Sequence, residues 1–263
     1  MKHPVIALLT DFGNGDFFVG SMKGVIAGIL PAAKFIDITH EVPSFNIKAA
    51  AFVLRAAYRY FPRGTIFLVV VDPGVGTNRK VILVKTEDYH YIAPDNGVLS
   101  LTLQHDLPMD MCEVSNPEFF LPEVSCTFEA RDRMAPVAAR LASGTPLKKF
   151  GPVLPIYEKL ELAEPVKNEE EIRGEVLYAD KFGNLITNIP EDWLHEYIKE
   201  GRKELFLSVG ETRILYQNSY AEAGKGELLS LPGSLGLVEL AVREGSAAER
   251  LNLLPGASVR INK

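Results

Sequence analysis

Two uninterrupted apolar runs constrain the fold of this chain more than any other feature. Val5–Leu9 and Thr65–Val71 are rich in β-branched residues and are bounded by turn-forming residues. Strands that are apolar without alternation are typical of a parallel sheet that helices cover on both faces. Phe35–Thr39 and Val81–Thr86 are predicted to be further strands, and the apolar spacing of Asn46–Tyr60 predicts a helix. Strands that alternate with helices predict an α/β fold for this half of the chain.

The pattern changes after an acidic, proline-containing stretch at 161–172, which we expect to link two domains. Beyond it, one clear helix is expected near Glu191–Lys199. The remaining segments are short strands between glycine-rich turns, namely Gly174–Tyr178, Glu204–Val209, Thr212–Tyr216, Glu227–Leu231, Leu237–Val242 and Ser258–Ile261. Such a series is typical of a small β-barrel or sandwich. We therefore expect an α/β domain with a mostly parallel sheet at 1–160 and a β-barrel domain at 173–263.

Composition and charge argue against several kinds of partner. The 263 residues carry a formal net charge of −6 and no cluster of Lys or Arg, which disfavours a nucleic acid or an anionic membrane. The N-terminal apolar run is too short for a signal peptide or a membrane span, so we expect a cytoplasmic protein. Cys112 and Cys126 lack metal-ligand spacing and are expected to be reduced thiols, with a single disulfide as the alternative.

An acidic residue stands close behind each of the two buried strands. Asp11 follows the first strand and Asp72 follows the second, and glycines come soon after both. Ligands of α/β sheets bind beyond the carboxyl ends of the strands, so the two acids together indicate a site. Each acid alone is equally well explained as a turn cap. The glycines at 74–76 precede a strand, whereas a dinucleotide fingerprint opens a helix, so we expect a plain tight loop there and another turn at 93–97.

A second group of candidates lies at 129–132, before a predicted helix at Arg133–Ser143. Asp132 is a candidate N-cap and could pair with Arg131 at the start of that helix. Glu129 is a candidate for chemistry, with a solvated surface position as the alternative. His40 stands at a strand end, where a structural role is the better interpretation. No HxH, HExxH or CxxC arrangement occurs, so the sequence predicts neither a metal site nor a cofactor.

Seven segments, taken in order, carry a resemblance to a known family. They are LLTDFG (Leu8–Gly13), DITHEVPSFNI (Asp37–Ile47), VVVDPGVGTNR (Val69–Arg79), APDNG (Ala93–Gly97), TFEARD (Thr127–Asp132), YADKFGNLITNI (Tyr178–Ile189) and LPGSLGLVELAVREGSAAERL (Leu231–Leu251). Together they span nearly the whole chain and resemble the S-adenosylmethionine hydroxide adenosyltransferase family, the water-using relatives of the fluorinases and chlorinases.

The resemblance implies a fold, a reaction and an assembly. The family joins an N-terminal α/β domain to a C-terminal β-barrel, in agreement with the pattern of strands and helices above. Its reaction converts S-adenosylmethionine and water into adenosine and methionine. The resemblance also implies a homotrimer, with the substrate between the N-terminal domain of one subunit and the C-terminal domain of the next.

The resemblance also implies which residues activate water. Asp72 and Arg79 match two members of the family's Asp–Arg–His group, and Glu129 stands where the histidine would be. We predict that Glu129 and Asp72 jointly hold the water. Two acids that share a small site raise the pKa of one of them, so Arg79 is needed to offset their repulsion.

Five further residues match positions that bind the ribose, the sulfonium and the amino acid. Asp11 matches the acid that receives the ribose hydroxyls, a suitable role for a carboxylate with two acceptor oxygens. Phe45 and Phe128 match aromatic positions that line the nucleoside and the sulfonium. Asp16 and Asp180 match positions that hold the methionine ammonium group.

The second domain supplies the remaining matches. Phe182 and Asn184 lie in the segment that contacts adenine, and Ser234 matches a contact to the methionine carboxylate. The halogenating relatives have an arginine beside that serine, but this chain has Leu235. Backbone N–H groups near Gly233–Gly236 are expected to replace that arginine.

Three other functions stay open at this point. A halogenase of the same superfamily is disfavoured because the carboxylate of Asp72 would repel a halide. A metal-dependent hydrolase could use Asp11, Asp16 and Asp72 as ligands, although the DxDxxxDD run of nucleoside hydrolases is absent. A non-catalytic protein that binds S-adenosylmethionine or adenosine is the third, because the family's histidine is replaced.

Overall fold

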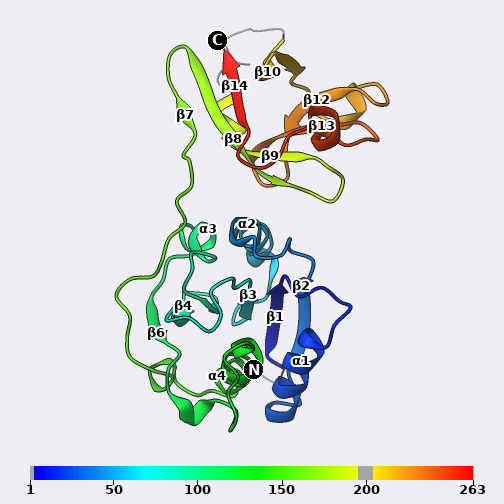
Figure 1. Cartoon of the computed structure of the whole chain (residues 1–263). Helices are drawn as coiled ribbons and strands as arrows, with labels where there is room; N and C mark the ends of the chain where they lie inside the picture. The colour runs from blue at the N-terminus through cyan, green and yellow to red at the C-terminus, as the bar shows by residue number, and fades with distance from the viewer. Residues whose placement is uncertain (1–2, 195–203, 263) are drawn as a thin grey trace. The chain divides into compact units, whose positions relative to one another are not determined.

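A computed structural model describes residues 3–194 and 204–262 and divides the chain into two compact units, Met1–Leu160 and Glu161–Lys263 (Figure 1). Each unit is described by itself. The segment 161–172, expected to be a linker, contains the short strand β7 (Val166–Lys167), which pairs with the start of β8 (Glu171–Ala179). The helix expected near Glu191–Lys199 begins at residues 192–194, and its remainder lies outside the described residues.

The first unit contains a sheet with the strand order β2-β1-β3-β5-β4-β6. Its strands are β1 (Val5–Thr10), β2 (Lys34–Thr39), β3 (Ile66–Val70), β4 (Val81–Lys85), β5 (His90–Pro94) and β6 (Asp110–Glu113). The pairs β1–β2, β1–β3 and β3–β5 are parallel, whereas β4 is antiparallel to both of its neighbours. The prediction of a mostly parallel sheet in an α/β unit is confirmed.

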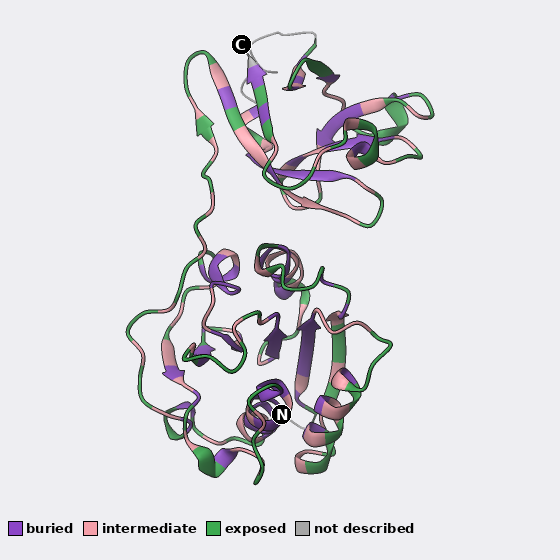
Figure 2. Cartoon of the chain, in the orientation of Figure 1, coloured by how far each residue is buried: buried purple, intermediate pink, exposed green. Residues whose placement is uncertain are grey.

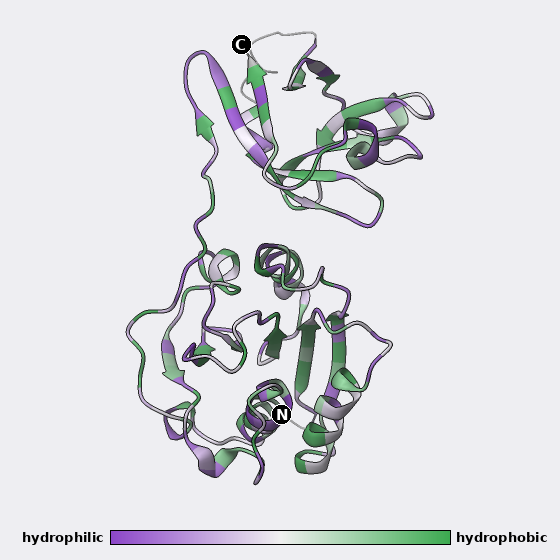
Figure 3. Ribbon diagram, in the orientation of Figure 1, coloured by the Kyte–Doolittle hydropathy of each residue, from purple (hydrophilic) through white to green (hydrophobic). Residues whose placement is uncertain are grey.

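Helices cover both faces of this sheet, which explains the two apolar runs. α1 (Phe18–Ile29) packs with α4 (Ala135–Ala142) on one face, and α2 (Ile47–Ala57) lies with α3 (Ser100–Leu103) on the other (Figure 1). Figures 2 and 3 show β1 and β3 as buried and hydrophobic along almost their whole length. Burial of these strands from both sides supplies the hydrophobic driving force for this unit.

Two helix boundaries follow from local chemistry. Asn46 caps α2, because its side-chain oxygen accepts a hydrogen bond from the Ala49 N–H at 2.9 Å. The helix expected from Arg133 begins earlier, with a π-helical turn at Ala130–Met134 that leads into α4. Asp132 is therefore not an N-cap as predicted. Its backbone N–H already donates to the Phe128 carbonyl at 3.2 Å, which places it inside the turn.

The second unit is a nearly closed antiparallel sheet, as predicted. Its order is β11-β10-β14-β8-β9-β13-β12, and an isolated bridge between Tyr216 and Ser230 joins its two edges. The strands are β8, β9 (Leu185–Pro190), β10 (Phe206–Val209), β11 (Thr212–Leu215), β12 (Leu228–Pro232), β13 (Leu237–Val242) and β14 (Ser258–Asn262). Apolar side chains from these strands fill the centre of the barrel. Sequence analysis missed β9 and the short helix α6 (Ala247–Leu251).

Two further observations concern the cysteines and the membrane prediction. Cys112 and Cys126 are both free thiols, the first buried and the second exposed. No helix among residues 3–194 and 204–262 has the length and apolar character that crossing a membrane requires.

Candidate active site

A cavity of about 330 Å³ opens at the carboxyl end of the parallel strands in the first unit. β1 and β3 pair in register, with Thr10 beside Val70, so the residues that follow them leave the sheet at the same edge. Five residues predicted from the sequence line this cavity, namely Asp11, Phe45, Asp72, Phe128 and Glu129. The structure therefore brings together residues that lie up to 118 positions apart in the sequence.

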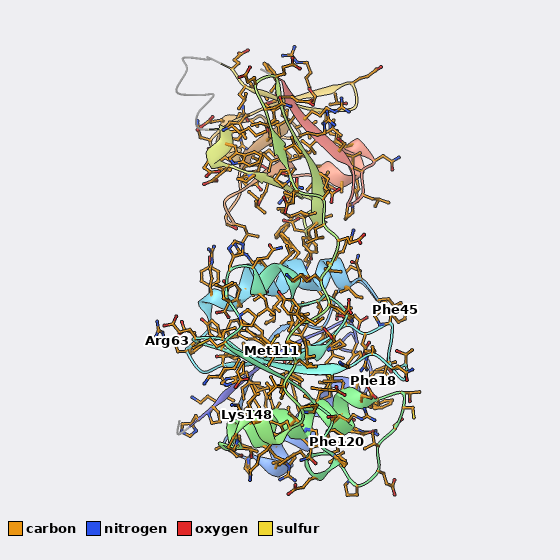
Figure 4. The ribbon with its side chains drawn as sticks, turned by 90° about the vertical axis from the view of Figure 1, so that its left-hand side faces the viewer. Phe18, Phe45, Arg63, Met111, Phe120 and Lys148 are labelled. Carbon is orange, nitrogen blue, oxygen red and sulfur yellow. The ribbon has the colours of Figure 1, made fainter. Side chains whose placement is uncertain are left out.

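Asp11 is held by the loop that carries Phe45. The Phe45 backbone N–H donates to Asp11 Oδ2 at 2.8 Å. Phe45 adopts a left-handed backbone conformation with φ of 65°, which is rare for an aromatic residue, and its side chain is 70% exposed. Strained backbone of this kind persists where the surrounding structure enforces it and is common at ligand sites. Phe45 and Phe18 lie on the same side of this unit (Figure 4).

The Asp11 loop is supported from inside by His40. Thr10 Oγ1 lies 2.9 Å from His40 Nδ1, and the His40 carbonyl accepts a hydrogen bond from the Gly13 N–H at 2.7 Å. On its other side, His40 Nε2 lies 3.1 Å from Asp37 Oδ1. His40 is buried between these contacts, and its role as a structural histidine stays a prediction.

Arg79 connects the two acids of the cavity. Its Nε donates to Asp72 Oδ1 at 2.9 Å, and its Nη2 lies 2.5 Å from Asp72 Oδ2, so the pair is bidentate. The same Nη2 also donates to Glu129. Burial alone would lower the pKa of Arg79, but its hydrogen bonds to the two carboxylates raise it above the usual value. The guanidinium therefore stays charged and offsets one of the two negative charges.

Arg79 stands behind the acids rather than at the cavity surface. It lines a neighbouring cavity of about 540 Å³ instead. The side chains of Arg79, Asp72 and Glu129 are all at least nine-tenths buried. The two carboxylates therefore face the first cavity while the guanidinium fixes them from the other side.

The π-helical turn sends neighbouring charged side chains in different directions. Asp132 pairs with Arg131 at 2.6 Å and accepts the Ser125 N–H at 2.8 Å, so the predicted ion pair forms. Burial works against ionisation of Asp132, but these contacts lower its pKa below the usual value. Glu129, just before the turn, points instead towards the cavity and also contacts Arg133, with 3.0 Å between Arg133 Nη1 and Glu129 Oε1. The spacing of Glu129 and Arg133 was a signal in the sequence for this ion pair, because residues i and i+4 share a helix face. Arg133 was nevertheless not predicted.

A cluster of phenylalanines forms one wall of the cavity. Phe128 packs edge-on against Phe12 and Phe18, with ring centroids 6.0 and 5.2 Å apart. The exposed ring of Phe17 stacks on Phe18 at 4.5 Å. The guanidinium of Arg131 lies 4.8 Å from the Phe128 ring centroid on top of this cluster. Only Phe128 was predicted, although the pair at 17–18 at the start of a helix was visible in the sequence.

Asp16 is the predicted residue of the first unit that the structure does not place with the others. It is exposed in the loop before α1 and does not line the cavity. Its sequence position near Asp11 gave no information on where the loop directs its side chain.

The second unit contains a separate cavity of about 820 Å³, and all four predicted residues of this unit line it, namely Asp180, Phe182, Asn184 and Ser234. Asp180 closes the turn between β8 and β9. Its Oδ1 accepts the N–H groups of Phe182 and Asn184 at 2.8 and 2.9 Å, and its Oδ2 accepts the Asn184 amide at 2.9 Å. This hydrogen-bonded turn leaves the Phe182 ring exposed at its tip.

The glycine turn around Ser234 has fewer available N–H groups than predicted. The Gly233 N–H donates to the Leu237 carbonyl at 2.8 Å, and the Gly236 N–H donates to the Gly233 carbonyl at 3.1 Å. These bonds close the hairpin between β12 and β13. Among the described residues, the N–H groups of Ser234 and Leu235 have no backbone acceptor and are the two that remain for a ligand.

Several lining residues of this cavity were not predicted, and two of them contact each other. Tyr220 and Glu239 come from segments far apart in the sequence and meet inside the cavity, close to Asp180. Burial and the nearby charge of Asp180 raise the pKa of Glu239, although a hydrogen bond from Tyr220 opposes the shift. An added Cβ on Gly233 would lie 2.3 Å from Glu239 Oε1, so a larger residue at this position would displace the Glu239 side chain.

Comparison with known families agrees with this arrangement. Residues 6–151 match the N-terminal domain of the SAM hydroxide adenosyltransferases, and residues 174–260 match the C-terminal domain. The chain belongs to this family.

Individual members of the superfamily have names that state different activities. A Thermus thermophilus protein named (R)-S-adenosyl-L-methionine hydrolase is 35% identical, and the match covers 97% of this chain and 98% of the relative. A fluorinase from Actinopolyspora mzabensis is more distant, at 28% identity over 100% of this chain and 98% of the relative. The crystal structure of an uncharacterized conserved protein from Thermotoga maritima has a TM-score of 0.91 and 41% identity, covering 98% of this chain and 100% of that one.

Proposed function

We propose that this adenosyltransferase homologue is an enzyme that hydrolyses S-adenosyl-L-methionine to adenosine and L-methionine. Membership of the family and full-length similarity to proteins named (R)-S-adenosyl-L-methionine hydrolase support the substrate and the reaction. The observation that carries the proposal is the pair of buried carboxylates, Asp72 and Glu129, which Arg79 holds at the wall of an aromatic cavity.

The chemistry suits this group. A bond forms between the water oxygen and the ribose 5′ carbon while the carbon–sulfur bond breaks, and its electron pair stays on sulfur. The sulfonium thereby becomes a neutral thioether, which leaves without being protonated. Positive charge moves onto the attacking water, where the carboxylates of Asp72 and Glu129 stabilise it and accept the proton.

The same charge distribution favours water over a halide. Water gains positive charge as it attacks, and nearby carboxylates stabilise this change. A halide arrives with a full negative charge, which the carboxylates of Asp72 and Glu129 repel. We therefore assign the chain to the hydrolase branch of the superfamily rather than the halogenase branch.

Other residues of the first cavity are proposed to bind the nucleoside. Asp11 accepts the ribose hydroxyls, and its bond to the Phe45 N–H fixes its orientation. Phe45 and Phe128 lie where aromatic faces can attract the sulfonium through cation–π interaction, which is worth about 0.5–2 kcal/mol at such sites. Orientation of the 5′ carbon against the water can supply up to about 7–11 kcal/mol of the barrier reduction in ideal cases.

Residues of the second cavity are proposed to bind the rest of the substrate. Asp180 is assigned to the methionine ammonium, Ser234 to its carboxylate, and Asn184 to adenine beside the exposed ring of Phe182. Asp16, from the first unit, is also assigned to the ammonium on the strength of the family resemblance. The hydrogen-bonded turn at Asp180 supports the assignment, because it fixes the carboxylate before substrate arrives.

A direct assay tests the proposed function. The purified protein is incubated with S-adenosylmethionine in ¹⁸O-labelled water. Adenosine is then separated by chromatography, and its mass is determined by mass spectrometry. We expect adenosine with the label in its 5′-hydroxyl group, and we expect Asp72→Asn to lower kcat by about a hundredfold or more. Activity should persist in EDTA. Binding without turnover would instead indicate a sensing protein, and chlorodeoxyadenosine formed in chloride would indicate a halogenase.

We further propose that the enzyme is a homotrimer whose substrate site combines the first unit of one subunit with the second unit of its neighbour. Asp72→Asn and Asp180→Asn each disable one half of the site, so each variant alone should be inactive. When the two variants are mixed and allowed to exchange subunits, about one quarter of the sites should combine two intact halves. Recovery of that fraction of activity supports a shared site, whereas no recovery places both halves in one subunit.

A further inference from the structure

The acidic pair of the candidate active site has a second guanidinium partner. Arg133 Nη1 lies 3.0 Å from Glu129 Oε1, on the opposite oxygen from the one that Arg79 contacts. The Arg133 guanidinium also rests on the ring of Phe120, 5.4 Å from its centroid, and its Nε is buried without a hydrogen-bond partner. Each carboxylate oxygen of Glu129 therefore contacts a different guanidinium, and these two contacts fix the positions of both oxygens.

This contact completes the charge balance of the group. Asp72 and Glu129 bring two negative charges, and Arg79 alone offsets one of them. Arg133 offsets the other, so the four formal charges cancel. By the family resemblance, a histidine stands at the position of Glu129, and a neutral histidine beside one acid and one arginine gives the same net charge. The Glu129–Arg133 pair has no net charge. The whole group therefore has the same total charge as it would with a single neutral histidine at position 129.

We infer that Arg133 is a positioning residue of the hydrolysis reaction, which orients Glu129 towards the water and cancels its negative charge. This inference rests on the proposed function. Arg133 does not line the cavity, so it acts through Glu129 and not on the substrate. Its loss should therefore lower kcat and leave KM for S-adenosylmethionine nearly unchanged.

A double-mutant cycle tests whether Arg133 acts through Glu129. Arg133→Gln in the wild-type protein should lower kcat by about tenfold, a part of the effect that a general base contributes. In the Glu129→Gln background, the same change should cause no further loss of kcat, because the group through which it acts is already gone. If the two losses multiply instead, Arg133 has only a structural role and the inference is wrong. If the wild-type protein forms no adenosine, the proposed function itself is wrong.

Arg140 provides a matched control on the same helical segment. Its guanidinium also lies over a phenylalanine ring, 5.9 Å from the Phe119 centroid, and its Nε is likewise buried without a partner. Among the described acids, none forms an ion pair with Arg140. Arg140→Gln removes the same packing and should change kcat by no more than about twofold. A loss equal to that of Arg133→Gln would show that disturbed packing, and not Glu129, explains both effects.

A replacement at position 129 gives the sharpest result. In Glu129→His the site gains a neutral side chain but keeps both guanidiniums, so it carries excess positive charge that disfavours positive charge on the attacking water. Adding Arg133→Gln restores neutrality. We expect Arg133→Gln to raise kcat in the Glu129→His background although it lowers kcat in the wild-type protein. A decrease in both backgrounds would contradict the charge argument.

Discussion

Gly76 lies where the two loops that carry the proposed catalytic group approach each other, and its replacement tests how closely they must approach. Asp72 and Arg79 lie on either side of it in the sequence, and the segment that leads to Glu129 passes directly above it. A Cβ on Gly76 would lie 2.8 Å from the carbonyl oxygen of Cys126, and the backbone there has a φ of 79°. The Gly76→Ala variant therefore introduces both backbone strain and a steric clash.

The two effects have different magnitudes and different consequences. An alanine in the left-handed region costs about 1–2 kcal/mol of folding free energy. Relief of the clash requires the Cys126 backbone to move by about half an ångström, since interiors are packed without free space. Misplacement of a reacting group by about 1 Å can cost about a hundredfold in rate, so we expect Gly76→Ala to lower kcat by about tenfold or more.

A substitution at Gly144 separates the effect of backbone strain from the effect of a steric clash. It has a φ of 98°, but an added Cβ would meet nothing within 4 Å. Gly144→Ala should therefore lose a similar amount of stability in thermal unfolding while adenosine formation proceeds at the wild-type rate. If Gly76→Ala lost stability but kept its full kcat, the close approach of the two loops would not matter for catalysis and the argument would fail.

Three other predictions concern single residues. Phe45→Gly should raise the melting temperature by relieving the left-handed backbone, and it should raise KM for S-adenosylmethionine by removing the exposed ring. Burial raises the pKa of Asp37, but contacts from Lys23 and His40 outweigh it and lower the pKa, so its stabilising contribution is present above pH 3.8 and is lost as the pH falls through the lower folded value. Urea unfolding of Asp37→Asn at pH 7 and pH 3 should therefore show a smaller acid-induced loss of stability than the wild type. Burial and Asp180 raise the pKa of Glu239, so Glu239→Gln should stabilise the protein at pH 7 and not at pH 4, and equal effects at both would contradict that shift.

Much of the first unit could be predicted because its signals are local and strong. The runs that became β1 and β3 have no polar alternation, which only a strand buried on both faces tolerates. Once those strands are parallel neighbours, the placement of Asp11 and Asp72 at one edge follows from sheet geometry. The family resemblance added Arg79 and linked it to Glu129, and the meeting of these two residues depends on loops that no periodicity describes.

The features that were missed depend on tertiary packing. Asp132 has a residue type that favours an N-cap, but the helical turn begins upstream of it, and its side chain pairs with Arg131 instead. Tyr220 lies in a 3-10 turn at Tyr220–Glu222 and Glu239 lies in β13, so their meeting depends on tertiary packing that the short runs of the second unit do not encode locally. Asp16 does not line the first cavity, because closeness in sequence to Asp11 does not fix the direction of a side chain in a loop, and its role stays a prediction.

The pairing of β1 with β3 has a consequence for the choice of sulfonium compound. Asp11, proposed to bind the ribose, and Asp72, proposed to hold the water, follow two adjacent strands, whose separation is fixed near 4.8 Å by their backbone ladder. Side-chain substitutions cannot change that spacing. An analogue with one extra methylene between ribose and sulfur would displace the electrophilic carbon by about 1.5 Å from its partner. The fixed spacing of these two strands thus selects among sulfonium metabolites by the length of the linkage between ribose and sulfur.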